Sequence, residues 1–210
     1  GWASGQVASA TGYVDGAARF ESGLVPTNRS RGVHVPYSSV LDLTSAGTVE
    51  AWAYPYSFGD NNNGGLVHRG DSGDTTPGYF VDETYSLQFY DAGPETALFA
   101  IDGGNTYVTY SGVTASNWYH VVGMWDMSKI WVYVNGLTDD PAGVACPGGA
   151  ATSTGGLNLG CQLMGPPSQW LNDNTYESMN GILDEARVSN VKRSTNWLWA
   201  TWMTMASNRV

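Results

Sequence analysis

Short stretches in which polar and apolar residues alternate recur along this chain, separated by clusters of Gly, Asn, Asp and Pro. In TVEAWAYP, residues 48–55, small apolar side chains stand at every second position between larger or charged ones. Alternation with this period places the apolar side chains on one face of a β-strand, and the clusters between the stretches favour turns. Many short strands of this kind predict an all-β fold, an antiparallel β-sandwich or jelly roll.

The strongest pair of predicted strands is NWYHVVGMWD, 117–126, followed by SKIWVYVNG, 128–136. The connection between them is so short that we expect a β-hairpin, and Asn135-Gly136 supplies the next turn because both residues tolerate positive φ. The stretch 137–156 is rich in Gly, Ala, Pro and Thr, and we expect a loop there. Further strands are expected at 16–21, 32–36, 64–70, 78–82, 85–90, 96–102 and 105–112.

The last part of the chain has a different pattern. RSTNWLWATWMTMAS, 193–207, contains no Gly or Pro, and Leu198, Trp202 and Ala206 recur at every fourth position. We therefore predict a short C-terminal helix over 194–206, with Ser194 as its N-cap and the apolar stripe docked against the sandwich.

Length and charge limit the possible partners. A chain of 210 residues fits one domain, and we expect 1–210 to form a single unit. The formal charge of −10, from 19 acidic and 9 basic residues, argues against nucleic acid and anionic membranes, since both are polyanions. No run approaches the ~20 apolar residues of a membrane span. Because the chain begins with Gly1 rather than Met, we expect a processed protein or an excised module.

The chain has two cysteines, Cys146 and Cys161. They can form one disulfide that closes a short loop, which stabilises a fold by ~3 kcal/mol in the chain-entropy model. The alternative is a pair of reduced, buried thiols. We expect the disulfide and an extracellular location, secreted or on the cell surface, because the composition is acidic, aromatic and poor in Lys. Neither cysteine has the CxxC spacing of zinc and redox motifs.

Five segments of the chain occur in the order found in one family of jelly rolls. They are GYVDGAARFE, VPYSSVLDLTSAGTVEAWAYP, GGLVHRGDSG, NWYHVVGMWD with IWVYVNG, and MNGILDEARVSNVKRS. In this order they resemble laminin-G-like modules, the concanavalin A-like jelly rolls common in bacterial secreted proteins, from about Gly12 to Trp202. The resemblance implies two packed antiparallel sheets, one of them concave, with carbohydrate or protein binding as the usual activity and Ca²⁺ as the usual ion.

We therefore predict a non-catalytic, lectin-like module that binds a polysaccharide or another glycan and contains structural Ca²⁺. The alternative is an adhesive or structural protein-interaction module, one of several domains in a larger surface or secreted protein.

Catalysis has little support in the sequence. Jelly-roll glycosidases, which this fold resembles, carry the pattern E-x-D-x-x-E, and retaining hydrolysis needs two carboxyl groups ~5 Å apart. Residues 48–55 contain only Glu50, and LDEARV places Asp184 and Glu185 on opposite faces of a strand. The histidines are isolated in sequence and are expected to be structural: His34, His68 and His120.

The best candidate for sugar recognition is the loop SQWLNDNTYE, 168–177. Trp170 and Tyr176 would stack on the C–H faces of a sugar. Aromatic residues of the sheet would add to this surface: Tyr54, Tyr56, Trp52 and Tyr90. Trp170 can equally well cover the edge of the sandwich. Polar residues between the two aromatic ones would bind hydroxyl groups: Asn172, Asp173 and Asn174. Three other tryptophans lie in strong strands and are expected in the core: Trp118, Trp125 and Trp131.

Two places in the sequence are candidates for Ca²⁺. In HRGDSGD, 68–74, Asp71 and Asp74 offer the oxygen ligands that Ca²⁺ prefers, although Asp and Gly also simply form turns. In GILDEARVS, 181–189, strand parity places Asp184 on the same face as apolar residues, where an unpaired carboxylate is costly. The resemblance implies structural Ca²⁺ shared by Asp184 and the segment from Gly12 to Asp15; hydrogen bonds to backbone N–H groups or hydroxyls, or an exposed strand end, are the alternatives.

Glu50 and Arg187 both fall on the parity opposite to the apolar residues of their strands. If the two strands are neighbours, these side chains form a cross-strand ion pair with a structural role, which we favour over a role in ligand binding.

Overall fold

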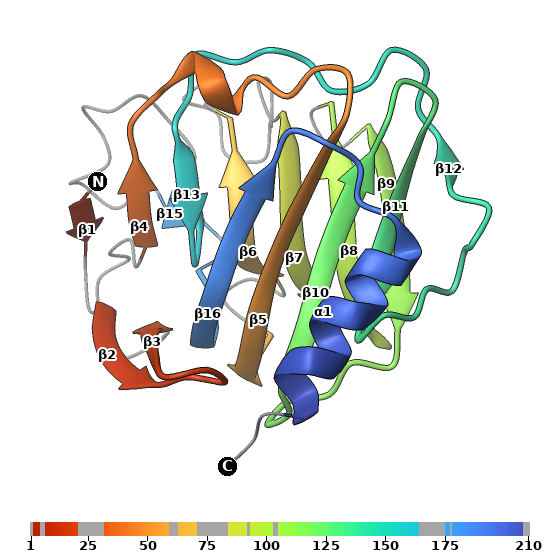
Figure 1. Ribbon diagram of the computed structural model, residues 1–210. Helices are drawn as coiled ribbons and strands as arrows, with labels where there is room; N and C mark the ends of the chain where they lie inside the picture. The colour runs from red at the N-terminus through yellow and green to blue at the C-terminus, as the bar shows by residue number, and fades with distance from the viewer. Residues whose placement is uncertain are drawn as a thin grey trace.

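The computed structural model describes residues 2–4, 7–20, 32–58, 63–70, 84–91, 93–102, 105–163, 175–176 and 178–207. Its strands form two seven-stranded antiparallel sheets, and a small two-stranded sheet accompanies them (Figure 1). The first large sheet, called sheet A, has the order β1-β4-β13-β6-β7-β8-β9, and the second, sheet B, has the order β12-β11-β10-β5-β16-β3-β2. The predicted antiparallel β-sandwich is therefore confirmed.

The strands of sheet A are β1 (Trp2–Ser4), β4 (Gly32–Val35), β13 (Leu157–Leu159), β6 (Asn63–Arg69), β7 (Tyr85–Asp91), β8 (Glu95–Ile101) and β9 (Thr106–Ser111). Those of sheet B are β12 (Val144–Ala145), β11 (Lys129–Val134), β10 (Tyr119–Trp125), β5 (Gly47–Ser57), β16 (Asn180–Ser189), β3 (Gly16–Phe20) and β2 (Val7–Thr11). The small sheet consists of β14 (Gln162–Leu163) and β15 (Thr175–Tyr176). The predicted strand at 78–82 lies outside the described residues.

The core lies between the two large sheets, and the alternation of β5 explains which side chains enter it. Val49, Ala51 and Ala53 have no exposed surface and belong to this core. The intervening side chains of β5 consequently project from the other face of sheet B, which we call its outer face. The core is packed closely: a Cβ on Gly123 of β10 would lie 2.1 Å from the ring of Phe99.

The hairpin predicted for 117–136 is confirmed. β10 pairs with β11 from Val121↔Val134 to Trp125↔Ile130. Asp126 follows β10 and accepts hydrogen bonds from Ser128 and from the Lys192 side chain. Burial raises the pKa of Asp126, but these bonds lower it more, so that the net pKa lies well below its ordinary range.

A helix, α1 (Thr195–Ser207), covers part of the outer face of sheet B, in front of β10 and β11 (Figure 1). The oxygen of the Ser194 side chain accepts a hydrogen bond from the Trp197 N–H at 3.2 Å, so the predicted N-cap is confirmed. Leu198 is fully buried and docks the helix onto a cluster on sheet B that consists of Val122, Met124, Trp131 and Tyr133. Among the described residues, no helix is long and apolar enough to cross a membrane.

Candidate functional site

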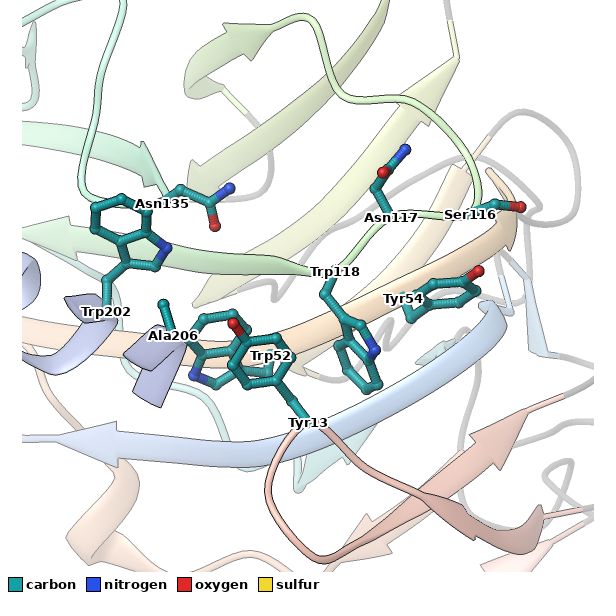
Figure 2. A pocket seen from close by; sticks show the side chains of 9 residues that line it. All are labelled: Tyr13, Trp52, Tyr54, Ser116, Asn117, Trp118, Asn135, Trp202 and Ala206. Atoms are coloured by element: carbon teal, nitrogen blue, oxygen red, sulfur yellow. The ribbon is translucent and has the colours of Figure 1, made fainter. Parts of the chain in front are cut away.

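A pocket of about 400 Å³ opens on the outer face of sheet B, beside the C-terminal half of α1 (Figure 2). Side chains from the β2–β3 turn, from β5, from the segment before β10 and from α1 meet there. The pocket is lined by Tyr13, Trp52, Tyr54, Ser116, Asn117, Trp118, Asn135, Trp202 and Ala206. Most of the apolar lining is aromatic, and we call it the aromatic pocket.

Trp52 forms the floor of the aromatic pocket and is 2% exposed. The Tyr13 ring stacks on it with the centroids 3.7 Å apart and the planes at 11°. On the other side the His120 ring lies 5.2 Å from the Trp52 centroid, at 21°. The indole N–H donates to the Met205 sulfur of α1 at 3.1 Å. Because Trp52 is held on all these sides, the surface open to a ligand comes from its neighbours.

Asp184 fixes the turn that carries Tyr13. Its Oδ2 accepts a hydrogen bond from the Val14 N–H at 2.9 Å, and its Oδ1 accepts one from the Glu185 N–H at 2.8 Å. The approach is close, because a Cβ on Gly12 would lie 2.4 Å from Asp184 Oδ2. The sequence left three alternatives for the partner of the Asp184 carboxylate. The described contacts correspond to one of them, hydrogen bonds from backbone N–H groups.

The parity predicted for Asp184 is wrong, and a β-bulge explains why. Asp184 pairs with Trp52 and Arg187 pairs with Glu50, so two residues of β16 oppose the single residue of β5 between these pairs. Glu185, in the bulge, has a φ of 50°. The extra residue reverses the alternation along β16. Leu183 therefore belongs to the core, and Asp184 shares the outer face with Trp52.

Trp118 and Tyr54 form one side of the aromatic pocket. Their ring centroids are 5.5 Å apart, and Trp118 also meets Tyr13 edge-on at 5.5 Å. Trp118 precedes β10 and is only partly buried, so its predicted place in the core is wrong. The other two tryptophans are buried as predicted, Trp125 between the sheets and Trp131 under α1.

Helix α1 provides the opposite side through Trp202 and Ala206 (Figure 2). The apolar stripe predicted as a docking face thus has two roles: Leu198 docks the helix, and the next two members of the stripe line the pocket.

Polar groups occupy the rim across from Tyr13 (Figure 2). Asn135 Oδ1 accepts a hydrogen bond from the His120 N–H at 2.9 Å, and the Asn117 amide nitrogen donates to Thr114 Oγ1 at 3.0 Å. These bonds fix both amide groups in place. Within the described residues they leave Asn135 Nδ2 as a donor and Asn117 Oδ1 as an acceptor that a ligand can use.

Below Trp52 lies a buried acid–base pair. Glu50 Oε2 is 2.8 Å from His120 Nε2, and both side chains are almost fully buried. Arg187 Nη1 lies 3.8 Å from Glu50 Oε1, directly across the strand pair. The predicted cross-strand ion pair is confirmed. Because Glu50 and His120 are almost fully buried and neither lines the aromatic pocket, we assign this group a structural role.

Several predicted site residues lie outside the described part of the chain: Trp170, Asn172, Asp173, Asn174, Asp71 and Asp74. Tyr176 falls in β15, but its side chain is not described. Tyr54 and Trp52, which the sequence suggested as contributions from the sheet, both line the aromatic pocket. The sequence pattern does not identify Tyr13 or Trp202, because their place depends on a turn and a helix that pack from opposite ends of the chain.

The described contacts of Asp184 are with the backbone of its own turn and strand. Both carboxylate oxygens accept N–H groups, and Asp15 contributes its backbone oxygen to the Gly12 N–H within the same turn. Among the described residues, no three His, Cys, Asp or Glu side chains come together as metal ligands would. Calcium stays a prediction, both at Asp184 with Asp15 and at Asp71 with Asp74.

The predicted disulfide is absent, and Cys146 and Cys161 are free, buried thiols. Cys146 follows β12 at one edge of sheet B, whereas Cys161 follows β13 of sheet A and lies against Gly32. Spacing in the sequence gave no information about this separation in the fold. Burial raises the pKa of the Cys161 thiol to about 12, so this sulfur stays protonated at neutral pH.

Solved structures share the fold at low sequence identity. Domain 4 of the extracellular arabinanase AbnA from Geobacillus stearothermophilus, in complex with arabinotriose, is 16% identical with a TM-score of 0.56, over 93% of this chain and 81% of that one. The binding domain of Paraclostridial Mosquitocidal Protein 1 is 11% identical with a TM-score of 0.61, over 97% and 47%. A putative carbohydrate binding protein from Bacteroides ovatus is 19% identical with a TM-score of 0.51, over 80% and 43%.

No curated protein matches the sequence significantly. The sequence profile of the laminin-G-like family, part of the concanavalin A-like lectin/glucanases superfamily, matches residues 27–198. With its two packed antiparallel sheets and this match over most of its length, the chain belongs to the laminin-G-like family of that superfamily.

Proposed function

We propose that this protein is a non-catalytic carbohydrate-binding module and that the aromatic pocket holds the sugar. The observation that carries the proposal is the set of partly buried rings of Tyr13, Tyr54, Trp118 and Trp202 beside two fixed amide groups. Sugars present flat C–H faces and a ring of hydroxyl groups, so they need aromatic surface and hydrogen-bonding groups together.

The size and polarity of the pocket agree with this role. A volume of about 400 Å³ is within the range of ~300–1,000 Å³ typical of small-molecule sites. Asn135 Nδ2 can donate to one hydroxyl group and Asn117 Oδ1 can accept from another, while the rings exclude water from the sugar face.

We favour binding without hydrolysis because the described residues that line the pocket include no carboxyl group. Glycosidases of the common types need two carboxyl groups flanking the scissile bond. Glu50 belongs to the same strand as Trp52, but it is bound to His120, is 2% exposed and does not line the pocket.

Known structures guide the choice of probe. One similar domain was solved with arabinotriose and another similar protein is described as carbohydrate binding. We therefore propose arabinotriose, xylotriose and cellotriose as first ligands in calorimetric titrations, followed by electrophoresis in gels that contain the matching polysaccharides.

Trp118→Ala is the decisive variant and Trp199→Ala is its matched control. Trp118 lines the pocket, whereas Trp199 is 53% exposed on α1 and is not part of the lining. Without the Trp118 ring to stack on the sugar, the affinity for the ligand should fall by at least tenfold, given ~1.4 kcal/mol per factor of ten. Binding that weakens equally in both variants, or in neither, contradicts the proposed site.

The loop at 168–177 is the competing location for the same function. If Trp170→Ala and Tyr176→Ala abolish sugar binding while Trp118→Ala leaves it unchanged, the glycan binds to that loop instead.

A protein-interaction module is the second candidate, favoured by exposed apolar side chains on and beside α1. Trp199, Met203 and Leu137 are 53%, 38% and 62% exposed. A stable complex with another domain that is lost in Trp199→Asp, without any glycan binding by the wild-type chain, would support this second function over the first.

We also propose an extracellular location and a structural Ca²⁺ ion. The location is supported by the acidic, Lys-poor composition. It is tested by fractionating producing cells with an antibody to the chain. Calcium has its support in the acidic loop at Asp71 and Asp74, and Asp71→Asn should remove any increase in melting temperature that Ca²⁺ causes.

A further inference from the structure

A row of buried polar side chains crosses four adjacent strands of sheet A. Register pairs Asn158 of β13 with His34 of β4 on one side and with His68 of β6 on the other, and His68 pairs with Ser86 of β7. These side chains are 5%, 1%, 2% and 1% exposed in the order His34, Asn158, His68, Ser86. We call these four residues, together with Gln162, the polar row.

The polar row faces away from the sandwich core. Its neighbours in sequence alternate with it, and Leu157, Val67 and Leu87 all belong to the core between the sheets. Successive side chains of a strand point to opposite faces, so Asn158, His68 and Ser86 lie on the outer face of sheet A. Polar groups on an outer face would normally be solvated, but these are buried.

Hydrogen bonds join members of the polar row. His34 Nδ1 is 2.7 Å from Asn158 Oδ1, and the Gln162 amide nitrogen donates to Ser86 Oγ at 3.1 Å. Ser86 Oγ in turn donates to Gln88 Oε1 at 3.3 Å. The side chains are therefore held in defined orientations.

Two glycines allow the close packing of this face. A Cβ on Gly156 would lie 2.3 Å from Cε1 of the His34 ring. A Cβ on Gly65 would lie 2.9 Å from the Gln162 backbone nitrogen, so the chain crosses β6 here in backbone contact. Crossing at Gly65 accounts for the burial of Gln162 and brings its amide group onto the same face as Ser86.

Among the described residues, two buried atoms of the polar row have no hydrogen-bond partner. Asn158 Nδ2 is a donor and Gln162 Oε1 is an acceptor, on side chains that are each 1% exposed. Buried polar atoms are costly unless they are hydrogen-bonded, and an unpartnered one calls for an explanation such as a ligand. One donor and one acceptor together suit hydroxyl groups, which accept and donate.

We propose that the polar row is a second binding site, which takes a hydroxyl-rich ligand of the neutral sugar class through hydrogen bonds from imidazole and amide groups. It lies on sheet A, across the core from the aromatic pocket on sheet B. Asn158 Nδ2 donates to one hydroxyl oxygen of the ligand, and Gln162 Oε1 accepts from a hydroxyl group. The proposal does not require the aromatic pocket to bind sugar.

Histidine signals provide the test, because the chain has three histidines and they report on different sheets. With ¹³C-labelled histidine, titration of arabinotriose, xylotriose or cellotriose should shift the ring signals of His34 and His68. His120, whose ring stacks on Trp52 of the aromatic pocket on sheet B, should shift only when a sugar occupies that pocket. If none of the three sugars moves the His34 and His68 signals, the polar row is a structural network and the proposal is overturned.

Asn158→Asp tests the donor directly, with Trp118→Ala as the matched variant in the other site. Aspartate keeps the shape and the oxygen that meets His34 but replaces Nδ2 by an acceptor. We expect it to reduce the sugar-induced histidine shifts by weakening binding about tenfold, as for loss of one hydrogen bond to a buried group. Trp118→Ala should leave these shifts intact even if it abolishes binding in the aromatic pocket.

The opposite pattern, shifts that vanish in Trp118→Ala and persist in Asn158→Asp, would overturn the second site and leave the proposed function standing. Melting curves establish that each variant is folded. If Asn158→Asp does not fold, the His34 and His68 signals in the wild-type titration decide alone.

Discussion

Replacing Asp184 by alanine should loosen the β2–β3 turn and lower the stability of the whole domain. The substitution removes the acceptors of the Val14 and Glu185 N–H groups. A hydrogen bond to a charged acceptor contributes about 1.5–3 kcal/mol, and water can partly replace the acceptor at this part-buried turn. We therefore expect a loss of about 2–3 kcal/mol, which corresponds to roughly 4–12 °C in the melting temperature of a chain this long.

The assay is urea unfolding followed by tryptophan fluorescence, together with near-ultraviolet circular dichroism of the native state. The midpoint should fall with little change in slope, as for a variant that unfolds the same surface. The dichroism should also change, because the turn holds Tyr13 against Trp52 at 3.7 Å. An unchanged midpoint and spectrum would refute the role assigned to Asp184.

Asp15→Asn is the matched control for a bound cation. Asp15 is exposed in the same turn, and Asn tolerates its φ of 54°. If the turn is held by backbone hydrogen bonds, Asp15→Asn and chelation of Ca²⁺ should both leave this part of the stability unchanged. If both reduce it as strongly as Asp184→Ala does, a cation holds the turn and our interpretation is wrong.

Three further predictions concern the scaffold. Gly123→Ala should cost about 1–3 kcal/mol through overpacking in the core, while Gly16→Ala, where the added Cβ meets nothing within 4 Å, should stay near wild type in the same urea assay. A carboxyl group with a lowered pKa stabilises the fold above its unfolded pKa and loses that contribution as pH falls through the folded value. Wild type should therefore lose more stability than Asp126→Asn on acidification below the ordinary pKa of 3.8. Parallel curves of stability against pH for the two proteins would contradict this. Thiol titration in denaturant without reductant should find two thiols per chain, and finding none would restore the disulfide.

The strands and their core faces were predictable because they depend on local pattern. Alternation in β5 correctly assigns Val49, Ala51 and Ala53 to the core. The N-cap role of Ser194 was equally predictable, since an N-cap depends on its own side chain and on residues one turn away. These features need no knowledge of which strands become neighbours.

The two candidate sites depend on such neighbours, and local pattern could not reveal them. His34, His68 and Asn158 are far apart in sequence and become adjacent only because β13 inserts between β4 and β6. Tyr13 reaches Trp52 only through the turn that Asp184 holds. A bulge leaves no mark in the periodicity of a ten-residue strand, so a carboxylate on the outer face was assigned to the core face.

The bulge also makes β16 tolerant of a change in length at one position. Removing Glu185 would join Asp184 directly to Ala186 and restore an uninterrupted ladder with β5. If the pairing of Arg187 with Glu50 is kept, Ala186 opposes the residue between Glu50 and Trp52, so Asp184 still pairs with Trp52 on the outer face and Leu183 stays in the core. A single-codon deletion at the bulge should therefore be tolerated better than one elsewhere in the strand, which moves the side chains beyond it to the opposite face, and insertions and deletions among related chains should fall at the bulge.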